Sequence, residues 1–479
     1  MTAVADRIRA LPQRYGKTTL ILLAAIAAIG LGARAYVVVN PVEYPADDSR
    51  AYYALAKALY EEGSFGGPEF RDSSDWSPGA PLLYAASFYA TGGAREGTAR
   101  IVEALLGVAA ILVVFLLGRR LGGAADWRMP HAGSVVGLLA AFGVAVYPPF
   151  IHSTGELMSE PPAILTLPAA VLAFLWASEQ ERLRAWLLPG LLFGLTAMFR
   201  PEYLFVGVVF VVLAGIRAAT TAPFVACIPV GDKRRTERAA RGWKPGAASA
   251  AVFLAALLLP IVPWTIRNVD VLGRVVPIST GSGKALYVGT FLPADGEYQK
   301  VKAILVERYQ GRDLDPHSAA LEKIDPTPLF DRVADRYPDL PRDSALGKIG
   351  KENFSKYFGE DPLGYLGMTA RKVGRMWSSG VGEAMSSGLG RAVQILIVAL
   401  GLAGFVLLGL RRYWWELVAL ATPILIVTAI GAASLAAPRR NEVLMTLVFP
   451  LAALTLSRGV AAISSGREWS PEQASSPPN

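Results

Sequence analysis

Two adjacent carboxylates, Asp47 and Asp48, follow directly on the first apolar segment of the chain, residues 18–39. A carboxylate can act as a general base toward a hydroxyl group, and a pair of carboxylates can bind a divalent cation. Tyr52 and Tyr53 come next and are further candidates for the same site. The alternative is a structural role, because Asp also favours the start of a helix.

A second pair of carboxylates, Glu156 and Glu160, precedes a later apolar segment. Residues four apart share a face if their segment is helical, and two acidic loops in one protein suggest a shared acidic pocket. The alternative for Glu160 is that it only stabilises the start of the next helix, because the helix dipole favours a carboxylate there.

Arg200 and Glu202 interrupt two short apolar runs on either side of a proline. Ionisable residues at such a depth in a membrane protein are expensive to bury and usually functional. Both are therefore candidate site residues. The alternative is a contact between the two that only closes a hairpin.

Arg439 and Arg440 lie together between the last two apolar segments. Arginine recognises phosphate through two parallel hydrogen bonds, so this pair predicts an anion site at the membrane surface. The alternative is a tolerated exception to the rule that basic residues concentrate in cytoplasmic loops.

The segment Gly281-Ser282-Gly283-Lys284 resembles part of a nucleotide-binding loop. We exclude that function because Ile278 stands where the first glycine is required and no Ser or Thr follows Lys284. With Arg267, which lies a short distance earlier, this glycine loop could instead close over a lipid phosphate or a sugar.

The composition indicates the kind of protein that must position these residues. The chain has 479 residues, of which 53% are hydrophobic and 18% charged, against about 25% charged in ordinary soluble domains. Long apolar runs separated by short charged breaks predict an all-α polytopic membrane protein. One cysteine and three histidines exclude a disulfide framework and any zinc site that needs several such ligands. The net charge of +8 is interpreted through its distribution among the loops, and no nucleic-acid partner is predicted.

We predict about ten transmembrane helices, within a range of 9–13. Residues 79–90 are apolar but short and are expected to form an interfacial helix on the outer face. Arg34 lies near the outer end of the first span, where it either snorkels to the surface or points at the site. The ten spans are expected at about residues 18–39, 101–117, 133–147, 163–177, 186–199, 203–216, 247–264, 393–410, 415–433 and 443–456.

The basic loops orient these spans in the cell (cytoplasmic or inner) membrane. With both termini in the cytoplasm, most basic segments fall inside, as the positive-inside rule requires. The two acidic loops, Arg200 and the polar segment 265–390 then share the extracytoplasmic side. The basic segments placed inside contain Arg119, Arg120, Arg128, Arg182, Arg184, Lys233, Arg234, Arg235, Arg238, Arg241, Lys244, Arg411, Arg412 and Arg458.

The chain is expected to divide into four parts. Residues 1–264 form an N-terminal transmembrane catalytic module that includes a first outer loop over residues 40–98. Residues 265–390 form a small extracytoplasmic helical domain, because apolar residues recur there at helical spacing. Residues 391–458 form the C-terminal transmembrane helices, and residues 459–479 a disordered cytoplasmic tail.

The order of these motifs resembles the GT-C membrane glycosyltransferases over residues 35–456. The resemblance is strongest to the protein-mannosyltransferase-like branch of glycosyltransferase family 39, which includes aminoarabinose-transferase-like proteins. The segments that carry it are Asp47-Asp48 with Tyr52-Tyr53, residues 99–107 and 118–121, Glu156 to Pro161, Arg200-Pro201-Glu202, residues 263–268 and 273–280, and residues 354–377.

The resemblance implies transfer of a hexosyl or pentosyl group from a polyprenyl-phosphate-linked donor to a protein, lipid or glycan acceptor on the extracytoplasmic side. It also implies a catalytic Asp in the first outer loop; we favour Asp47, although the doublet leaves Asp48 open. The need for a divalent metal (Mg or Mn) is left undecided, with Asp47, Asp48 and Glu156 as ligands if there is one. Candidates for binding the donor phosphate, assigned by chemistry and topology, are Arg439, Arg440, Arg267 and Lys284.

The chemistry agrees with these residue types. An inverting single displacement needs one base to deprotonate the acceptor hydroxyl. The leaving lipid phosphate is already anionic, so nearby arginines suffice to stabilise it. The alternative function is a multi-pass transporter or flippase of a lipid-linked or small solute, which would also bury charges. Against it, the sequence shows no internal repeat and its charged residues gather on one side. The sequence does not exclude a catalytically inactive scaffold.

Overall fold

A computed structural model describes residues 15–41, 47–66, 73–124, 131–220 and 243–467. Every regular element in this part of the chain is a helix. Inside a bilayer an apolar segment must satisfy its own backbone hydrogen bonds, and the α-helix does so within one segment. The all-α fold class predicted from the apolar runs is therefore confirmed.

The first half of the chain forms the larger part of the membrane bundle. Short 3₁₀ turns cover Ser73–Asp75, Ser153–Gly155 and Leu183–Trp186. The α-helices are α2 (Lys17–Val39), α3 (Asp47–Glu62), α4 (Gly79–Thr91), α5 (Glu96–Ala124), α6 (Ala132–Val146), α7 (Pro148–His152), α8 (Glu160–Ala177), α9 (Leu187–Phe199), α10 (Tyr203–Ala219), α12 (Trp243–Leu258) and α13 (Ile261–Leu272).

The second half begins with short helices and ends with long ones. A further 3₁₀ turn covers Leu292–Ala294. The α-helices are α14 (Ser282–Thr290), α15 (Tyr298–Gln310), α16 (Ala319–Glu322), α17 (Thr327–Ala334), α18 (Arg342–Glu360), α19 (Pro362–Ser378), α20 (Glu383–Ser386), α21 (Gly388–Leu410), α22 (Trp414–Ala433) and α23 (Arg439–Arg467).

Six helices are long and apolar enough to cross a membrane: α2, α5, α8, α21, α22 and α23. Two bent pairs raise the number to eight if each is one span, namely α6 with the segment 148–155, bent by 55°, and α12 with α13, bent by 51°. The helical segment 183–199 and α10 are apolar but shorter. The number ten stays a prediction. The span expected over residues 247–264 coincides with α12 and the start of α13, and it bends next to Pro260, which cannot donate a backbone hydrogen bond.

Small residues allow the helices of the bundle to approach closely. Gly190 and Gly194 lie one turn apart on α9, and a Cβ atom on either would come within 2.4 Å of a backbone oxygen of α12. Such spacing of small residues is typical of helix contacts within membranes, where close packing replaces the hydrophobic effect. Buried side chains of α5, α6, α8, α9, α10, α12, α22 and α23 share one apolar core.

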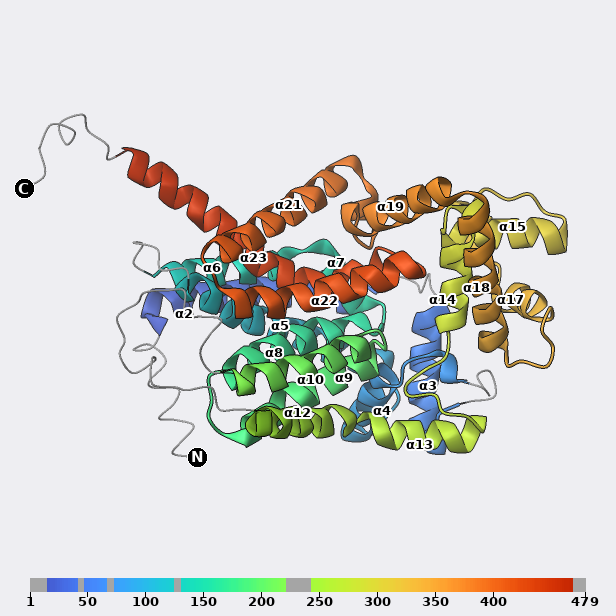
Figure 1. The fold of residues 1–479 in the computed structure, drawn as a ribbon, viewed down its shortest axis with the longest axis horizontal. Helices are drawn as coiled ribbons and strands as arrows, with labels where there is room; N and C mark the ends of the chain where they lie inside the picture. The colour runs from blue at the N-terminus through green and yellow to red at the C-terminus, as the bar shows by residue number, and fades with distance from the viewer. Residues whose placement is uncertain (1–14, 42–46, 67–72, 125–130, 221–242, 468–479) are drawn as a thin grey trace, which may run out of the picture.

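A second apolar core lies outside the bundle. Buried residues of α14, α15, α17 and α18 form it, with Phe330 and Leu346 among them. Figure 1 shows these four helices together beyond one end of the bundle, beside α3. Lys372 of α19 joins this part to α22 by donating hydrogen bonds to Gly289 O, Ala432 O and Ser434 O at 2.6, 3.0 and 2.9 Å.

The four-part division of the chain stays a prediction, but two of its boundaries meet continuous helices. The boundary after residue 264 falls inside α13. α23 continues to Arg467, so residues 459–467 are helical rather than part of a disordered tail; their Ala- and Ile-containing sequence favours continuation of the helix. The basic residues Lys233 to Arg241 and the remainder of the tail lie outside the described residues.

Candidate active site

Arg439, the first residue of α23, joins the starts of two other helices. Its Nη1 donates to Asp48 Oδ2 of α3 at 2.8 Å, and its Nε donates to Glu160 Oε1 of α8 at 2.9 Å. A cation at a helix N-terminus is unfavourable with the helix dipole, whereas carboxylates are favoured there. The two carboxylates therefore compensate the unfavourable interaction between the charge of Arg439 and the dipole of its own helix.

Arg200 extends this contact into a continuous series of ion pairs. Its Nη1 donates to Glu160 Oε1 at 2.6 Å, and its Nε and Nη2 donate to Glu202 Oε1 at 3.1 and 2.9 Å. We call the series Asp48–Arg439–Glu160–Arg200–Glu202 the ionic chain. The Arg200–Glu202 contact does more than close a hairpin, because Arg200 also binds a third segment of the protein.

The ionic chain is buried at one end and open at the other. The side chain of Glu160 is 2% exposed and that of Arg200 is 11% exposed. By contrast, the side chains of Arg439 and Asp48 are 34% and 41% exposed. A substrate can therefore approach the Asp48–Arg439 end, while the Arg200–Glu202 end supports it from within.

Opposing charges keep the carboxylates of the site ionised. Partial burial would raise the pKa of Asp48, but the charge and hydrogen bond of Arg439 lower it below its ordinary value. Burial would likewise raise the pKa of Glu202, but Arg200 and then Arg440 lower it to about 2. Both groups therefore carry negative charge at neutral pH.

Neighbouring side chains complete the surroundings of Asp48. Trp76 Nε1 donates to Asp48 Oδ1 at 3.3 Å, and the charge of Lys284 also lowers the pKa of Asp48. The Tyr52 hydroxyl lies 3.3 Å from Ser77 Oγ. Burial raises the pKa of Tyr52, and the negative charge of Asp48 raises it further. The side chain of Asp47 lies outside the described residues.

Arg440 presents a donor that the described residues leave unused. Its Nη1 atom is buried and has no hydrogen-bond partner among them, and the same is true of the Tyr203 hydroxyl. Both residues lie near enough to Glu202 to interact with its charge. Because buried polar atoms are usually satisfied, these two atoms are candidates for binding an oxygen of a ligand.

Two residues of α5 that the sequence reasoning missed position the second acidic segment. Arg100 Nε donates to Gly155 O at 3.0 Å, and Glu103 Oε1 accepts from Met158 N at 3.1 Å. The Tyr84 hydroxyl donates to Glu103, and it lies 2.9 Å from Met158 O. The sequence contained one signal for them. Arg100 and Glu103 are ionisable residues one helical turn apart at the start of an apolar run, where burial would require a partner.

Glu156 and Glu160 do not share a helix face. A 3₁₀ turn ends at Gly155, and Leu157 has φ = 54°, in the left-handed region, so no continuous helix joins the two carboxylates. Glu156 instead lies 3.5 Å from His152 Nδ1. Burial raises the pKa of Glu156 above its ordinary value, although His152 and Arg439 oppose this.

Three other candidates have local partners outside the ionic chain. Arg34 is buried and donates to Gly30 O at 3.0 Å and to Val144 O and Ala145 O at 3.3 Å, so it joins α2 to α6 rather than snorkelling. The Tyr53 hydroxyl donates to Ala94 O at 3.1 Å. Arg267 lies near the rings of Phe65 and Trp264, with its Nη2 donating to Phe65 O at 2.7 Å.

The glycine loop before α14 is occupied by the protein itself. Asp343 Oδ1 accepts from Gly283 N at 2.8 Å and from Lys284 N at 3.3 Å. A helix N-terminus binds anions through these amides, so the Asp343 carboxylate takes the place that we expected for a lipid phosphate. The Lys284 side chain lies 5.3 and 5.1 Å from the ring centroids of Tyr298 and Phe330.

The described residues do not form a site for a divalent metal. They contain no group of three or more His, Cys, Asp or Glu arranged to hold one. Asp48 and Glu160 face Arg439 rather than each other, and Glu156 pairs with His152. The side chain of Asp47, the third predicted ligand, lies outside the described residues, so the Mg or Mn site stays a prediction.

Part of this site lies in a segment that matches a known sequence family. Residues 75–228 match the sequence family described as dolichyl-phosphate-mannose-protein mannosyltransferase. This segment contains Glu160, Arg200 and Glu202 of the ionic chain, together with Arg100 and Glu103. No curated protein matches the sequence.

Solved structures share the fold. The oligosaccharyltransferase of Archaeoglobus fulgidus in its apo form matches with a TM-score of 0.54 at 16% identity, over 94% of this chain and 51% of that chain. AglB from Archaeoglobus fulgidus, in complex with an inhibitory peptide and a dolichol-phosphate, matches with a TM-score of 0.52 at 15% identity, over 98% of this chain and 53% of that chain. ArnT from Cupriavidus metallidurans, bound to undecaprenyl phosphate, gives a TM-score of 0.37 at 13% identity, over 95% of this chain and 81% of that chain. The chain thus spans about half the length of the two archaeal structures.

Proposed function

Because the chain has the GT-C fold and is related through residues 75–228 to the dolichyl-phosphate-mannose-protein mannosyltransferases, we propose that it transfers a hexosyl or pentosyl group from a polyprenyl-phosphate donor to a protein, lipid or glycan acceptor. The observation that carries this proposal is the open end of the ionic chain. There Asp48 and Arg439 lie 2.8 Å apart. Arg440, the next residue, has a buried Nη1 donor near Glu202 without a hydrogen-bond partner among the described residues. The reaction needs these two kinds of group.

Asp47 is the base in this proposal, and Asp48 positions the site. Both oxygens of Asp48 accept hydrogen bonds, one from Arg439 and one from Trp76. A carboxylate that is ion-paired and has a lowered pKa is a weaker proton acceptor. The adjacent Asp47 is thereby left to take the proton of the acceptor hydroxyl while the acceptor oxygen attacks the anomeric carbon of the sugar.

The arginines at the start of α23 stabilise the leaving lipid phosphate. As the bond between the anomeric carbon and the phosphate oxygen breaks, negative charge grows on that oxygen. Arg439 lies at the open end, so it can donate to the departing phosphate. Arg440 follows it directly and adds a positive charge from the side of Glu202. Lys284, whose charge acts on Asp48, adds a further cation. No general acid is required, because the leaving group is already an anion.

The family description names dolichyl-phosphate-mannose, and a dolichol-phosphate is bound to AglB in its solved structure. Both support a lipid-phosphate donor here. The sequence prediction places the site on the extracytoplasmic side. In this arrangement the donor enters from the outer leaflet, and the acceptor enters from the side of α14 to α18.

The experiment is an in vitro transfer assay with the full-length protein in proteoliposomes and defined polyprenyl-phosphate sugars, read out by mass spectrometry of the product. We expect a glycosylated product that is absent from empty liposomes. Uptake of a solute into the proteoliposomes with no transfer product would contradict the proposal and favour a transporter.

A further inference from the structure

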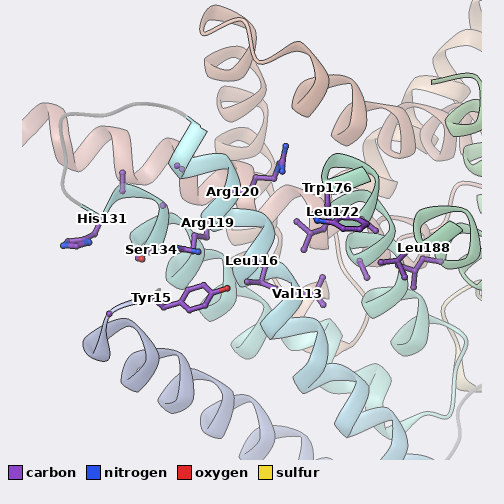
Figure 2. A pocket seen from close by; sticks show the side chains of 18 residues that line it. Tyr15, Val113, Leu116, Arg119, Arg120, His131, Ser134, Leu172, Trp176 and Leu188 are labelled. Atoms are coloured by element: carbon purple, nitrogen blue, oxygen red, sulfur yellow. The ribbon is translucent and has the colours of Figure 1, made fainter. Parts of the chain in front are cut away.

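A second arginine-containing region lies at the opposite end of the same helices. A cavity of about 1020 Å³ opens between the C-terminal halves of α5 and α8 and the starts of α2, α6 and α9. Trp176, on its wall, is sixteen residues along α8 from Glu160, which corresponds to about 24 Å of helix. The cavity is therefore separate from the ionic chain. Figure 2 shows Arg119 and Tyr15 on one side of it and Leu172, Trp176 and Leu188 on the other.

The wall of the cavity is apolar and partly exposed. Leu116, Trp176 and Leu188 are 37%, 45% and 49% exposed. α5 and α8, which carry two of them, are candidate membrane spans, so this wall lies at the depth of lipid chains. The apolar lining residues are Val113, Leu116, Leu172, Trp176, Leu188 and Leu192.

The mouth of the cavity is cationic. Arg119 lies 4.3 Å from the ring centroid of Tyr15. Arg120 also lines the cavity. It pairs with Glu179, whose side chain is 54% exposed, at 2.7 Å and with Glu416, whose side chain is 15% exposed, at 3.3 Å.

A smaller adjoining cavity of about 500 Å³ adds to this charge. It shares Trp176 and Leu188 with the first and is lined by Arg182 and Arg184. Four arginines thus line the two cavities.

We propose that this cavity binds a phospholipid with an anionic headgroup, from the leaflet opposite the candidate active site. Its phosphate is held by Arg119 and Arg120, because guanidinium groups match phosphate geometry, and an acyl chain lies along the apolar wall between α5, α8 and α9. A free phosphate ion would leave that wall without a partner. The site does not depend on the proposed transfer reaction.

The test is native mass spectrometry of the full-length protein in detergent, titrated separately with phosphatidylglycerol and phosphatidylcholine. The natural protein is expected to retain phosphatidylglycerol preferentially. The double variant Arg119→Gln/Arg120→Gln should lower this preference by about fivefold or more. Arg119→Lys should keep most of it. Arg411→Gln is the matched control, because Arg411 is an exposed arginine beyond the end of α21 that does not line the cavity.

A second variant tests the acyl-chain wall without changing charge. Ala169 lines the cavity and is half-buried, so Ala169→Phe should reduce retention of both lipids. If size-exclusion chromatography shows that the double arginine variant does not fold, Ala169→Phe still tests the proposal.

Three results would overturn the proposal by themselves. They are equal retention of the two lipids by the natural protein, an unchanged preference in the double arginine variant, and unchanged lipid retention by Ala169→Phe. Binding of a polyprenyl phosphate that depends on Arg119 and Arg120, where phosphatidylglycerol binding does not, would also overturn it by identifying a different lipid.

Discussion

The two ends of the helix bundle both contain arginines beside carboxylates, but they use them differently. In the ionic chain, Glu160 is 2% exposed and bound by arginines from two distant segments. At the opposite end, Arg120 pairs with Glu179, whose side chain is 54% exposed. Removing one partner of a buried pair leaves an uncompensated charge, whereas an exposed pair is solvated when broken. The first arrangement is therefore fixed by the fold, whereas the Arg120–Glu179 pair can open to solvent. The other partner of Arg120, Glu416, is 15% exposed.

The largest effect is expected at the open end of the ionic chain. Arg439→Gln removes a donor to the leaving phosphate, and loss of one such donor lowers kcat by roughly 10²–10³. The measurement is the initial rate of sugar transfer in proteoliposomes. Arg411→Gln is the control and should transfer at the natural rate; an equal loss in both variants would mean that the effect is not local to the site.

Arg200→Met tests the buried end. It leaves Glu160 and Glu202 without their shared cation, and breaking a buried pair in this way costs about 3–5 kcal/mol. We expect a large fall in the melting temperature of the purified protein in detergent. A melting temperature equal to that of the natural protein would show that the ionic chain is not a structural support.

Glu103 is predicted to act through the acidic segment that it positions. Glu103→Leu removes the acceptor for Met158 N and Tyr84, and displacement of site groups by about 1 Å can cost up to about 100-fold in rate. Glu103→Gln keeps an acceptor oxygen and should restore most of the activity. If Glu103→Leu alters KM alone, or if both variants are equally impaired, this positioning role is wrong.

The pH dependence of transfer separates the two charges at the open end. In the natural protein Arg439 holds the pKa of Asp48 below its ordinary value, about 3.9, so Asp48 stays ionised and activity should not fall above about pH 5 on its account. Without Arg439, burial raises that pKa, and less of the carboxylate is ionised at a given acidic pH. The acid limb of the Arg439→Gln profile, scaled to its own maximum, should therefore move to higher pH. An unmoved limb would contradict the assigned pairing.

The smallest effect is expected at the opposite end. Arg120→Met breaks a pair with Glu179, whose side chain is 54% exposed, and a pair with Glu416, whose side chain is 15% exposed. The exposed pair is worth about 0–1 kcal/mol. The melting temperature should therefore fall less than that of Arg200→Met, and the rate of transfer should be unchanged. A loss of stability as large as that of Arg200→Met would remove the distinction between the two ends.

The sequence allowed the helices to be predicted but not their partners. Apolar runs located most membrane helices, because burial in lipid requires them locally. The pairing of Arg439 with Asp48 joins residues 391 positions apart, and no local pattern predicts it. Pro260 was a local signal for the bend after α12 that the length of the apolar run concealed.

Two further differences have similar causes. Asp343 binds the glycine loop from sixty residues away, so the loop alone resembled a phosphate site. Glu103 resembled an ordinary charge at the end of a helix, because its burial depends on the packing of Tyr84 and the segment that contains Met158.

Rates of sugar transfer by Asp47→Asn and Asp48→Asn, measured side by side with mass-spectrometric detection, test the central claim most directly. Both variants should remain folded in the membrane, as Glu61→Gln on the exposed face of α3 should. We predict that Asp47→Asn lowers the rate by roughly 10²–10⁴, the usual contribution of a general base, and that Asp48→Asn is also impaired because Arg439 loses its partner. Normal transfer by both aspartate variants would contradict the account.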